Sequence, residues 1–291
     1  MKSTFINISI ILLKIIIIIF VLILLSFLIF YFYLGANNKK FSPNILELEK
    51  NRKMLFAHRG IGNYYPENSI DAIRFADTLN FDAIEIDISS TADKKIILFH
   101  DEDTERLLGI KSKINQLNYH NIIKYNYIFN NKISNSKVVL LEEVFKEYGS
   151  KFFYYLDFKT ENYEIVLDAI DLIKKYKLTH KVIIASADIF LISKIEYDFP
   201  EINTCLEGFN SGKELFYYLI LAKLKPDYYS SFLKNVDFSH IEWLKKKNLL
   251  NRRIVYGVDS SNYKTAVSLG LPNLIIDYDS SYNRFFEKNK Y

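Results

Sequence analysis

The pattern of hydrophobic and polar residues divides the chain into a short apolar part and a long mixed part. From Ile15 to Leu34 the residues are Ile, Leu, Phe, Val and Tyr, interrupted only by Ser26. A helix of roughly 20 residues is about 30 Å long, which matches the hydrocarbon core of a bilayer. The segment has no polar face, so the pattern predicts a membrane-spanning helix rather than an amphipathic helix lying on the surface.

A cleaved signal peptide is the alternative for this segment. The apolar region of a signal peptide usually spans only about 7–15 residues and ends at a small-residue site. The apolar stretch here is longer, and Gly35-Ala36-Asn37 matches such a site poorly. The sequence therefore predicts a retained, single-pass anchor over residues 1–34.

The next segment, residues 35–52, is largely polar, contains Pro43 and is expected to be a linker. Fully extended, about 17 residues reach roughly 55–60 Å, so the following domain is expected to lie near lipid without having to touch it. Positive charges flank the apolar run on both sides and are nearly balanced close to it, which leaves the sidedness of the C-terminal domain open. These charges are Lys2 and Lys14 before the run, and Lys39, Lys40, Lys50, Arg52 and Lys53 after it.

Residues 53–291 alternate apolar runs of strand length with longer segments of helical spacing. Most of the runs lack polar alternation, as expected when both faces of a parallel sheet are covered. The length also suits one α/β barrel, which needs roughly 250 residues. A TIM (β/α)8 barrel is therefore predicted, with a doubly wound sheet as the alternative. Nine runs are candidate strands, one more than a barrel needs: Met54–Ala57, Ala83–Ile88, Ile96–Phe99, Phe152–Phe158, Val182–Ala185, Thr204–Glu207, the weaker Asp227–Ser230, Ile254–Val258 and Leu274–Ile276.

Seven segments between these runs have helical spacing. The first, Ser69–Leu79, can be capped by Asn68 or Ser69. Residues 109–137 are polar and rich in Asn, without a clear period, and are expected to form an excursion on the active-site side. The other predicted helices are Glu142–Tyr148, Tyr163–Tyr176, Phe190–Tyr197, Gly212–Leu224, His240–Lys247 and Asn262–Leu269.

Composition excludes several functions. The net charge is +4 with a pI of about 8.7, and no clustered basic stretch typical of a nucleic-acid-binding protein is present. The single cysteine, Cys205, excludes an intrachain disulfide and a metal site made of several cysteines.

Charged residues at the ends of the apolar strands carry the chemistry, because reactive groups of an α/β barrel collect at the C-terminal ends of its strands. His58 and Arg59 follow the first strand, and Gly60 comes next. Arginine binds phosphate through two parallel hydrogen bonds. This short motif is weak evidence taken alone.

Glu85 and Asp87 lie two residues apart on the second strand and therefore share one face, while Ile84, Ile86 and Ile88 share the other. Two carboxylates facing one interior are costly unless something neutralises them. A divalent cation with oxygen ligands, Mg²⁺ or Ca²⁺ rather than zinc, fits such a pair. The alternative is an exposed edge strand with solvated acids.

Two further strand ends supply similar groups. His100 follows the strand Ile96–Phe99, and histidine is the usual proton donor or acceptor near neutral pH. Asp157 and Lys159 share a face at the end of another strand, where Asp157 would complete a metal site and Lys159 would balance a phosphate. A surface ion pair is the alternative for these two. Together the strand ends provide what metal-assisted phosphodiester cleavage requires.

The order and spacing of these residues resemble the glycerophosphodiester phosphodiesterase family. The resemblance extends through residues 53–280, most clearly over the first 45 or so. It is carried by Ala57-His58-Arg59-Gly60, Pro66-Glu67-Asn68-Ser69, Asp82-Ala83-Ile84-Glu85-Ile86-Asp87, Thr91-Ala92-Asp93, His100-Asp101, Leu140-Leu141-Glu142-Glu143-Val144 and Asp157-Phe158-Lys159.

This resemblance implies a TIM barrel, over residues 53–291, that uses a divalent cation, Mg²⁺ or Ca²⁺, to hydrolyse glycerophosphodiesters or lysophospholipids. It implies that His58 and His100 are the acid/base pair and that Arg59 binds phosphate. Glu85 and Asp87 match two metal ligands. Lysophospholipase D enzymes, often attached to membranes, are among the relatives that the resemblance brings in.

Departures from the family pattern lie mainly in the second half of the barrel. Asp157 stands where the family usually has glutamate, one methylene longer, as the third metal ligand. Tyr256, in Tyr256-Gly257-Val258-Asp259, stands where the family often has tryptophan and is expected to line the substrate pocket. Asp277 matches a late aspartate of the family. A catalytically impaired, membrane-anchored barrel that binds phospholipid headgroups or a partner is the alternative to an active enzyme.

Overall fold

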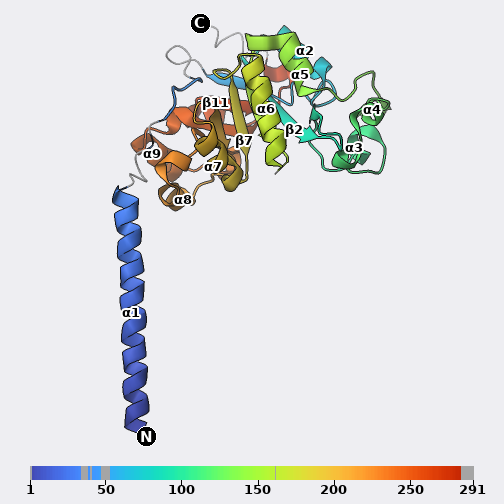
Figure 1. The fold of residues 1–291 in the computed structure, drawn as a ribbon. Coiled ribbons are helices and arrows are strands. Elements are labelled where there is room, and N and C mark those ends of the chain that lie inside the picture. Colours follow the sequence, from blue (N-terminus) through green and yellow to red (C-terminus); the bar gives the residue numbers. More distant parts are fainter. Residues whose placement is uncertain (1, 34–38, 40, 47–52, 161, 283–291) are drawn as a thin grey trace.

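The computed structural model describes residues 2–33, 39, 41–46, 53–160 and 162–282. Eight parallel strands form a closed barrel, because β1 pairs with both β2 and β11 (Figure 1). The predicted TIM barrel is therefore confirmed. Its strands are β1 (Met54–His58), β2 (Ala83–Ser90), β6 (Phe153–Phe158), β7 (Val182–Ser186), β8 (Asn203–Leu206), β9 (Tyr228–Phe232), β10 (Arg253–Val258) and β11 (Asn273–Ile276).

One of the nine candidate strands, Ile96–Phe99, lies outside the barrel. β3 (Ile96–Leu98) pairs antiparallel with the end of β2 and contacts no other barrel strand through backbone pairing. The weaker candidate, by contrast, is the barrel strand β9, whose apolar signal is diluted by Ser230 and Ser231. His100 therefore follows a strand that is not part of the barrel, which corrects the expectation that every reactive group lies at the end of a barrel strand.

Within the described residues, seven helices cover the outside of the barrel. Ser69 caps α2, because its hydroxyl accepts a hydrogen bond from the backbone of Ala72 at 3.1 Å. The helix predicted over 212–224 is shorter, and a 3-10 turn at Ala222–Leu224 follows it. These helices are α2 (Ile70–Thr78), α5 (Leu141–Tyr148), α6 (Tyr163–Lys175), α7 (Ile189–Asp198), α8 (Glu214–Leu219), α9 (Phe238–Lys246) and α10 (Tyr263–Ser268).

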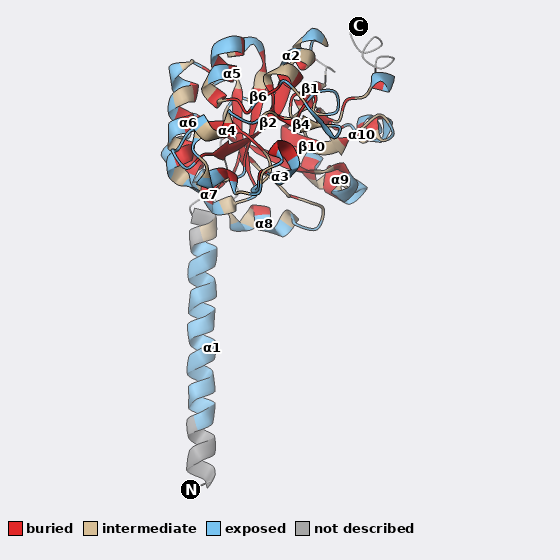
Figure 2. Cartoon of the chain, turned by 90° about the vertical axis from the view of Figure 1, so that its right-hand side faces the viewer, coloured by how far each residue is buried: buried red, intermediate tan, exposed pale blue. Residues whose placement is uncertain are grey.

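The core has two layers. Ile84, Ile86 and Ile88 point outwards from β2 and pack beneath the helices, as their alternation predicts. The second layer fills the barrel interior. Buried residues are concentrated on the central strands, and exposed residues lie on the outer helices (Figure 2). It contains Leu46, Met54, Phe56, Ala83, Tyr155, Ile183, Ala185, Cys205, Tyr228, Ile254 and Ile275.

The excursion between β3 and α5 has its own small core. Its elements are short: α3 (Glu105–Leu108), a 3-10 turn at Ile114–Gln116, α4 (Tyr119–Ile122), β4 (Ile128–Phe129) and β5 (Lys132–Ile133). Ile97, Phe99, Leu107, Leu108, Ile114, Ile122, Tyr127 and Val138 pack together inside it.

The N-terminal helix α1 (Lys2–Tyr33) extends away from the barrel (Figure 1). Its stretch Ser9–Ile29 is long and apolar enough to cross a membrane, and none of it is buried against the protein. A secretory signal near an N-terminus has the same properties. Leu34, at the end of the predicted anchor, and Lys40, Lys50 and Arg52, in the predicted linker, lie outside the described residues, as do residues 283–291.

The described part of the predicted linker packs against the barrel. Lys39 Nζ lies 2.8 Å from Glu196 Oε2 and 2.9 Å from Asp227 Oδ1, and only 6% of the Lys39 side chain is exposed. Asn44 Oδ1 accepts a hydrogen bond from the Tyr228 hydroxyl at 2.8 Å, and Leu46 is buried. While these contacts persist, the full reach of an extended linker is not available to the barrel.

Replacing Lys39 with methionine is expected to lower the free energy of unfolding by about 3 kcal/mol, because it leaves two buried carboxylates without their counter-charge. Methionine keeps most of the aliphatic stem, so the loss reports mainly on charge. Denaturant unfolding of the detergent-solubilised chain measures it. The matched control is Lys174→Met, since the Lys174–Glu201 pair is 42% and 48% exposed and should contribute less than about 1 kcal/mol. Equal losses in both variants would contradict the expectation.

Candidate active site

A cavity of about 330 Å³ opens at the C-terminal ends of the barrel strands. The sheet register brings the predicted residues together: His58 on β1 lies opposite Glu85 on β2, and Asp87 lies opposite Asp157 on β6. All eight residues singled out from the sequence line this cavity, namely His58, Arg59, Glu85, Asp87, His100, Asp157, Lys159 and Tyr256.

Three carboxylates form one side of the cavity. Glu85, Asp87 and Asp157 are buried, and each offers an oxygen within 4.8 Å of the other two. Burial and the neighbouring Asp87 raise the pKa of Glu85 to about 8. Burial and the nearby Glu207 raise the pKa of Asp157 to about 7. Burial and neighbouring carboxylates therefore disfavour the charged forms of Glu85 and Asp157. A cation with oxygen ligands would relieve that cost.

Asp87 differs from its two neighbours, because cationic groups surround it. Arg59 Nε lies 3.0 Å from one carboxylate oxygen and Lys159 Nζ 3.2 Å from the other. Burial alone would raise the pKa of Asp87, but Arg59 and Lys159 outweigh it and hold the pKa below its ordinary value. Lys159 also pairs with Asp157. Asp87 is thus held ionised where the three carboxylates meet.

Asn68 orients Asp87 and was not recognised from the sequence as a site residue. Its amide nitrogen donates to Asp87 Oδ2 at 2.8 Å, and its amide oxygen accepts from the Asp87 backbone at 3.0 Å. Asn68 therefore does not cap α2, which is capped by Ser69 instead.

The turn after β1 has an unusual backbone. Arg59 adopts a left-handed conformation with φ of 53°, and its backbone nitrogen donates to Glu85 Oε2 at 2.8 Å. Gly60 follows with φ of 74°, and a Cβ there would lie 2.8 Å from Ala72. Strained conformations of this kind cluster at functional sites, and here one directs the guanidinium towards Asp87.

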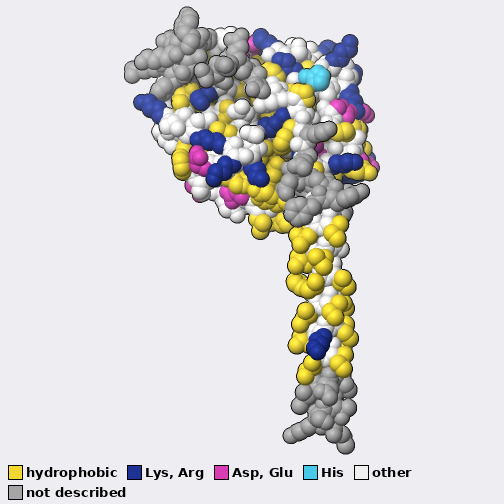
Figure 3. Space-filling model, turned by 90° about the vertical axis from the view of Figure 1, so that its left-hand side faces the viewer, with side chains coloured by type: hydrophobic (Ala, Val, Ile, Leu, Met, Phe, Trp, Pro, Cys, Tyr) yellow, Lys and Arg dark blue, Asp and Glu magenta, His cyan; other side chains and the backbone are white. Residues whose placement is uncertain are grey.

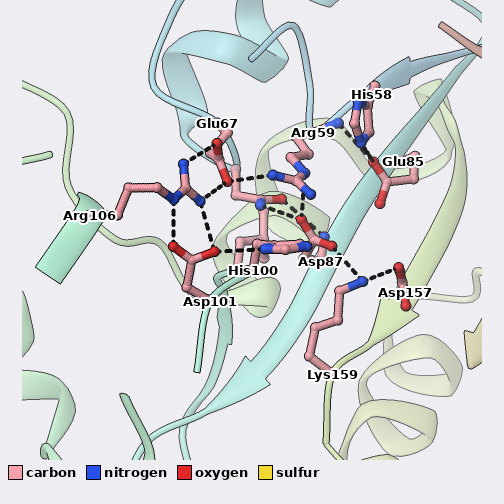
Figure 4. A network of polar contacts seen from close by, with 12 residues as sticks. His58, Arg59, Glu67, Glu85, Asp87, His100, Asp101, Arg106, Asp157 and Lys159 are labelled. Atoms are coloured by element: carbon pink, nitrogen blue, oxygen red, sulfur yellow. Dashed lines mark hydrogen bonds and ion pairs between the residues drawn. The ribbon is translucent and has the colours of Figure 1, made fainter. Parts of the chain in front are cut away.

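Each histidine of the cavity is paired with an aspartate through Nδ1. His58 Nδ1 lies 2.5 Å from Asp277 Oδ1. His100 Nδ1 lies 2.7 Å from Asp101 Oδ1 (Figure 4). Burial alone would lower the pKa of His58, but the hydrogen bond to Asp277 and the charge of Glu85 outweigh it and raise the pKa. The pairing fixes each ring and leaves Nε2 outside that hydrogen bond.

Glu67, Asp101 and Arg106 form a further ion network behind Arg59 and His100 (Figure 4). Arg106 donates to both oxygens of Glu67, at 2.8 and 2.9 Å, and to both oxygens of Asp101, at 2.6 and 2.9 Å. Glu67 in turn accepts from Arg59 at 2.7 Å. One ion network therefore connects His100, through Asp101, to Arg59. Arg106 belongs to the excursion, and nothing in its local sequence indicates this role.

The opposite wall of the cavity is aromatic and comes from the second half of the barrel. The rings of Tyr256 and Phe232 meet edge to face with centroids 5.6 Å apart. Gly257 has φ of 68°, and a Cβ there would collide with the Phe232 ring.

Glu207 also lines the cavity, although it was not recognised from the sequence as a site residue. It ends a predicted strand and accepts a hydrogen bond from the Tyr155 hydroxyl at 2.7 Å.

Comparison with known proteins places this geometry in a family. Residues 58–202, about half of the chain, match the model of the glycerophosphoryl diester phosphodiesterase family. Human lysophospholipase D GDPD1 is 22% identical over 283 residues, covering 84% of this chain and 90% of the relative.

Solved structures share the fold. An Oleispira antarctica phosphodiesterase in complex with the product sn-glycerol-3-phosphate superposes with a TM-score of 0.69 at 17% identity, covering 80% of this chain and 96% of its own. The glycerophosphodiester phosphodiesterase of Thermotoga maritima superposes with a TM-score of 0.65 at 18% identity, covering 81% of this chain and 100% of its own. Seven of the eight predicted site residues lie within the region that matches the family model; Tyr256 lies beyond it. The chain belongs to the glycerophosphoryl diester phosphodiesterase family of enzymes, which hydrolyse glycerophosphodiesters.

Proposed function

We propose that the chain hydrolyses glycerophosphodiesters to a phosphomonoester and an alcohol, and that Glu85, Asp87 and Asp157 hold a divalent cation, Mg²⁺ or Ca²⁺, for this reaction. The observation that carries the proposal is one cavity that joins three mutually close carboxylates to two aspartate-paired histidines. A bound cation supplies charge neutralisation and polarisation of a phosphoryl oxygen. Asp157 is shorter than glutamate, yet its oxygen lies within the same 4.8 Å cluster, which supports its inclusion.

The phosphate is proposed to bind beside Arg59 and Lys159. Both side chains lie against Asp87 at the edge of the cavity, and the buried carboxylates there raise the pKa of each, so both stay charged. A guanidinium presents two parallel donors to phosphate oxygens, whereas an ammonium acts as a point charge. The pair would hold the diester while its charge redistributes in the transition state.

His58 and His100 are proposed to move the protons. Because Nδ1 of each ring is held by an aspartate, proton exchange with the substrate would occur at Nε2. One histidine takes the proton of the attacking hydroxyl as its oxygen bonds to phosphorus. The other gives a proton to the alcohol oxygen as the P–O bond breaks. The attacking hydroxyl belongs either to water or to the glycerol of the substrate, and in the second case a cyclic phosphate forms first. Phosphorus NMR of the products over time separates the two routes.

A second cavity of about 440 Å³ adjoins the first and shares His100 and Lys159 with it. Its lining is largely hydrophilic and includes Ser89, Thr91 and Asn115. We infer that one polar end of the diester lies there. A panel of glycerophosphocholine, glycerophosphoethanolamine and lysophosphatidylcholine, assayed with each cation, tests this. Faster cleavage of the lysophospholipid than of both glycerol diesters would reject the assignment.

Asp277→Asn is expected to shift the pH profile of kcat/KM towards lower pH on the limb that His58 controls. The substitution weakens the hydrogen bond and removes the negative charge that favour the protonated imidazole, so the raised pKa of His58 falls. The direction is the same whether His58 acts as acid or as base, since either limb follows the same pKa. Initial rates between about pH 5 and 9 measure it. If only the amplitude falls and neither limb moves, Asp277 does not act through His58.

The helix α1 is proposed to remain on the mature protein as a membrane anchor, followed by a linker over 35–52 and the barrel over 53–291. Support comes from the length of the apolar stretch Ser9–Ile29. Intact mass spectrometry of the protein extracted from cell membranes tests it. A mature chain that begins after Leu34 would identify the segment as a cleaved signal.

A further inference from the structure

The short helix α8 exposes large apolar side chains. Leu215, Phe216 and Leu219 are 68%, 59% and 52% exposed, whereas Tyr217, on the opposite side of the helix, is buried against the barrel. Three neighbouring apolar groups on one turn differ from a lone exposed residue, because together they form a continuous surface that water solvates poorly. The other face of α8 is anchored, since Tyr217 packs edge to face with Trp243 at 5.4 Å.

The position of α8 indicates what covers this surface. In two perpendicular views α8 lies on the side of the barrel nearest to the upper end of α1 (Figures 1 and 2). Apolar side chains gather at this lower edge of the barrel, beside α1 (Figure 3).

The docked linker keeps the barrel near the membrane that α1 would cross. Only residues 34–38 separate Tyr33, the last residue of α1, from Lys39, which is ion-paired to the barrel through Glu196 and Asp227. Those five residues span at most about 20 Å. The barrel therefore cannot move far from the bilayer surface without breaking the buried contacts of Lys39.

Basic residues flank the apolar turn. Lys213 directly precedes α8 and Lys223 follows it four residues after its end, and both are exposed. Lysines beside apolar side chains suit a membrane interface, where the stems lie along the acyl boundary and the ammonium groups meet anionic headgroups.

We propose that Leu215, Phe216 and Leu219 of α8 insert into the interface of the membrane that α1 spans, so that the barrel rests on the bilayer. This inference depends on α1 being a retained anchor and is independent of the catalytic roles proposed above. The barrel then has two attachments to the lipid, one through α1 and one through α8, and its orientation to the bilayer is fixed.

The test places a fluorescent label at Phe216→Cys in the full chain, reconstituted in vesicles of equal parts phosphatidylcholine and phosphatidylglycerol. A lipid that carries a nitroxide near its headgroup quenches fluorophores in the interface. The matched control is Ile133→Cys, since Ile133 is 79% exposed but lies on β5 in the excursion, away from α1. The native Cys205 is buried, and the background labelling of this cysteine is measured on the unsubstituted chain.

We expect at least about threefold stronger quenching at position 216 than at 133, because only the former would lie at headgroup depth. Equal quenching at both positions in the reconstituted chain overturns the proposal. Weak lipid quenching at 216, with protection of the label that increases with protein density in the vesicle, also overturns it and indicates that a second copy covers the surface. If the chain does not float with the vesicles, α1 does not anchor it, and the proposal is also overturned.

Discussion

His58→Ala is expected to lower kcat for glycerophosphodiester hydrolysis by about 10³-fold, since a positioned general acid or base contributes roughly 10²–10⁴-fold. The side chain ends β1 and is held at Nδ1 by Asp277, 2.5 Å away, so its ring has a fixed position in the cavity. Because the side chain is partly exposed, its removal should leave the fold intact. The measurement is single-turnover release of the alcohol, with thermal unfolding recorded in parallel.

The matched control is His180→Ala. His180 is exposed and lies outside both cavities, so its rate should remain that of the unsubstituted chain. A His58→Ala variant that unfolds at the normal temperature and keeps more than about a tenth of the rate would be incompatible with an acid/base role.

Glu85→Gln is expected to lower kcat/KM by about 10³-fold and to abolish the rise in melting temperature that Mg²⁺ or Ca²⁺ produces, because a metal-liganding carboxylate is lost. Glutamine keeps an oxygen that can accept the hydrogen bond from the Arg59 backbone, so the turn should persist. Without cation, the substitution should raise the melting temperature of the chain. Burial and Asp87 raise the pKa of Glu85 from 4.5 to about 8, so its ionisation destabilises the native chain increasingly as pH rises through that window. Glutamine does not ionise, and the variant should therefore melt higher than the unsubstituted chain in chelator at alkaline pH.

Glu201→Gln is the control for this substitution, since Glu201 is an exposed carboxylate far from the cavity and in an ion pair with Lys174. It should leave both activity and the response to cations unchanged. Undiminished cation binding by Glu85→Gln combined with Asp87→Asn, measured by calorimetry, would show that the cation binds elsewhere.

The barrel could be predicted because most of its strands are uninterrupted apolar runs. The exceptions have local causes. Ser230 and Ser231 weaken the apolar signal of β9, and the apolar run of β3 resembles that of a barrel strand although it pairs antiparallel. Pairing direction depends on the tertiary arrangement and not on the residues of one strand.

The cavity could be predicted in part for the same reason. Residues at strand ends converge in any α/β barrel, so Glu85, Asp87 and His58 followed from position alone. Glu207 and Asp277 obey the same rule and could have been added to the site. Arg106 could not, since its partner Glu67 lies 39 residues away and the contact exists only after the excursion folds.

The linker was the least predictable part. Its polar composition favours an extended tether, whereas Lys39 pairs with Glu196, 157 residues further along the chain. Such a long-range ion pair has no local signature. The consequence is that the barrel is held close to the end of α1 instead of ranging over the distance that an extended linker would allow.

The decisive experiment is hydrolysis of glycerophosphocholine by the full chain in detergent, followed by phosphorus NMR. The chain is first treated with chelator and then supplied with Mg²⁺ or Ca²⁺. We predict that glycerol 3-phosphate appears only after a cation is added, and not with Glu85→Gln. If the folded chain binds the cation but cleaves no glycerophosphodiester, or if cleavage continues unchanged in chelator, the chain is not a phosphodiesterase that depends on a cation at this site.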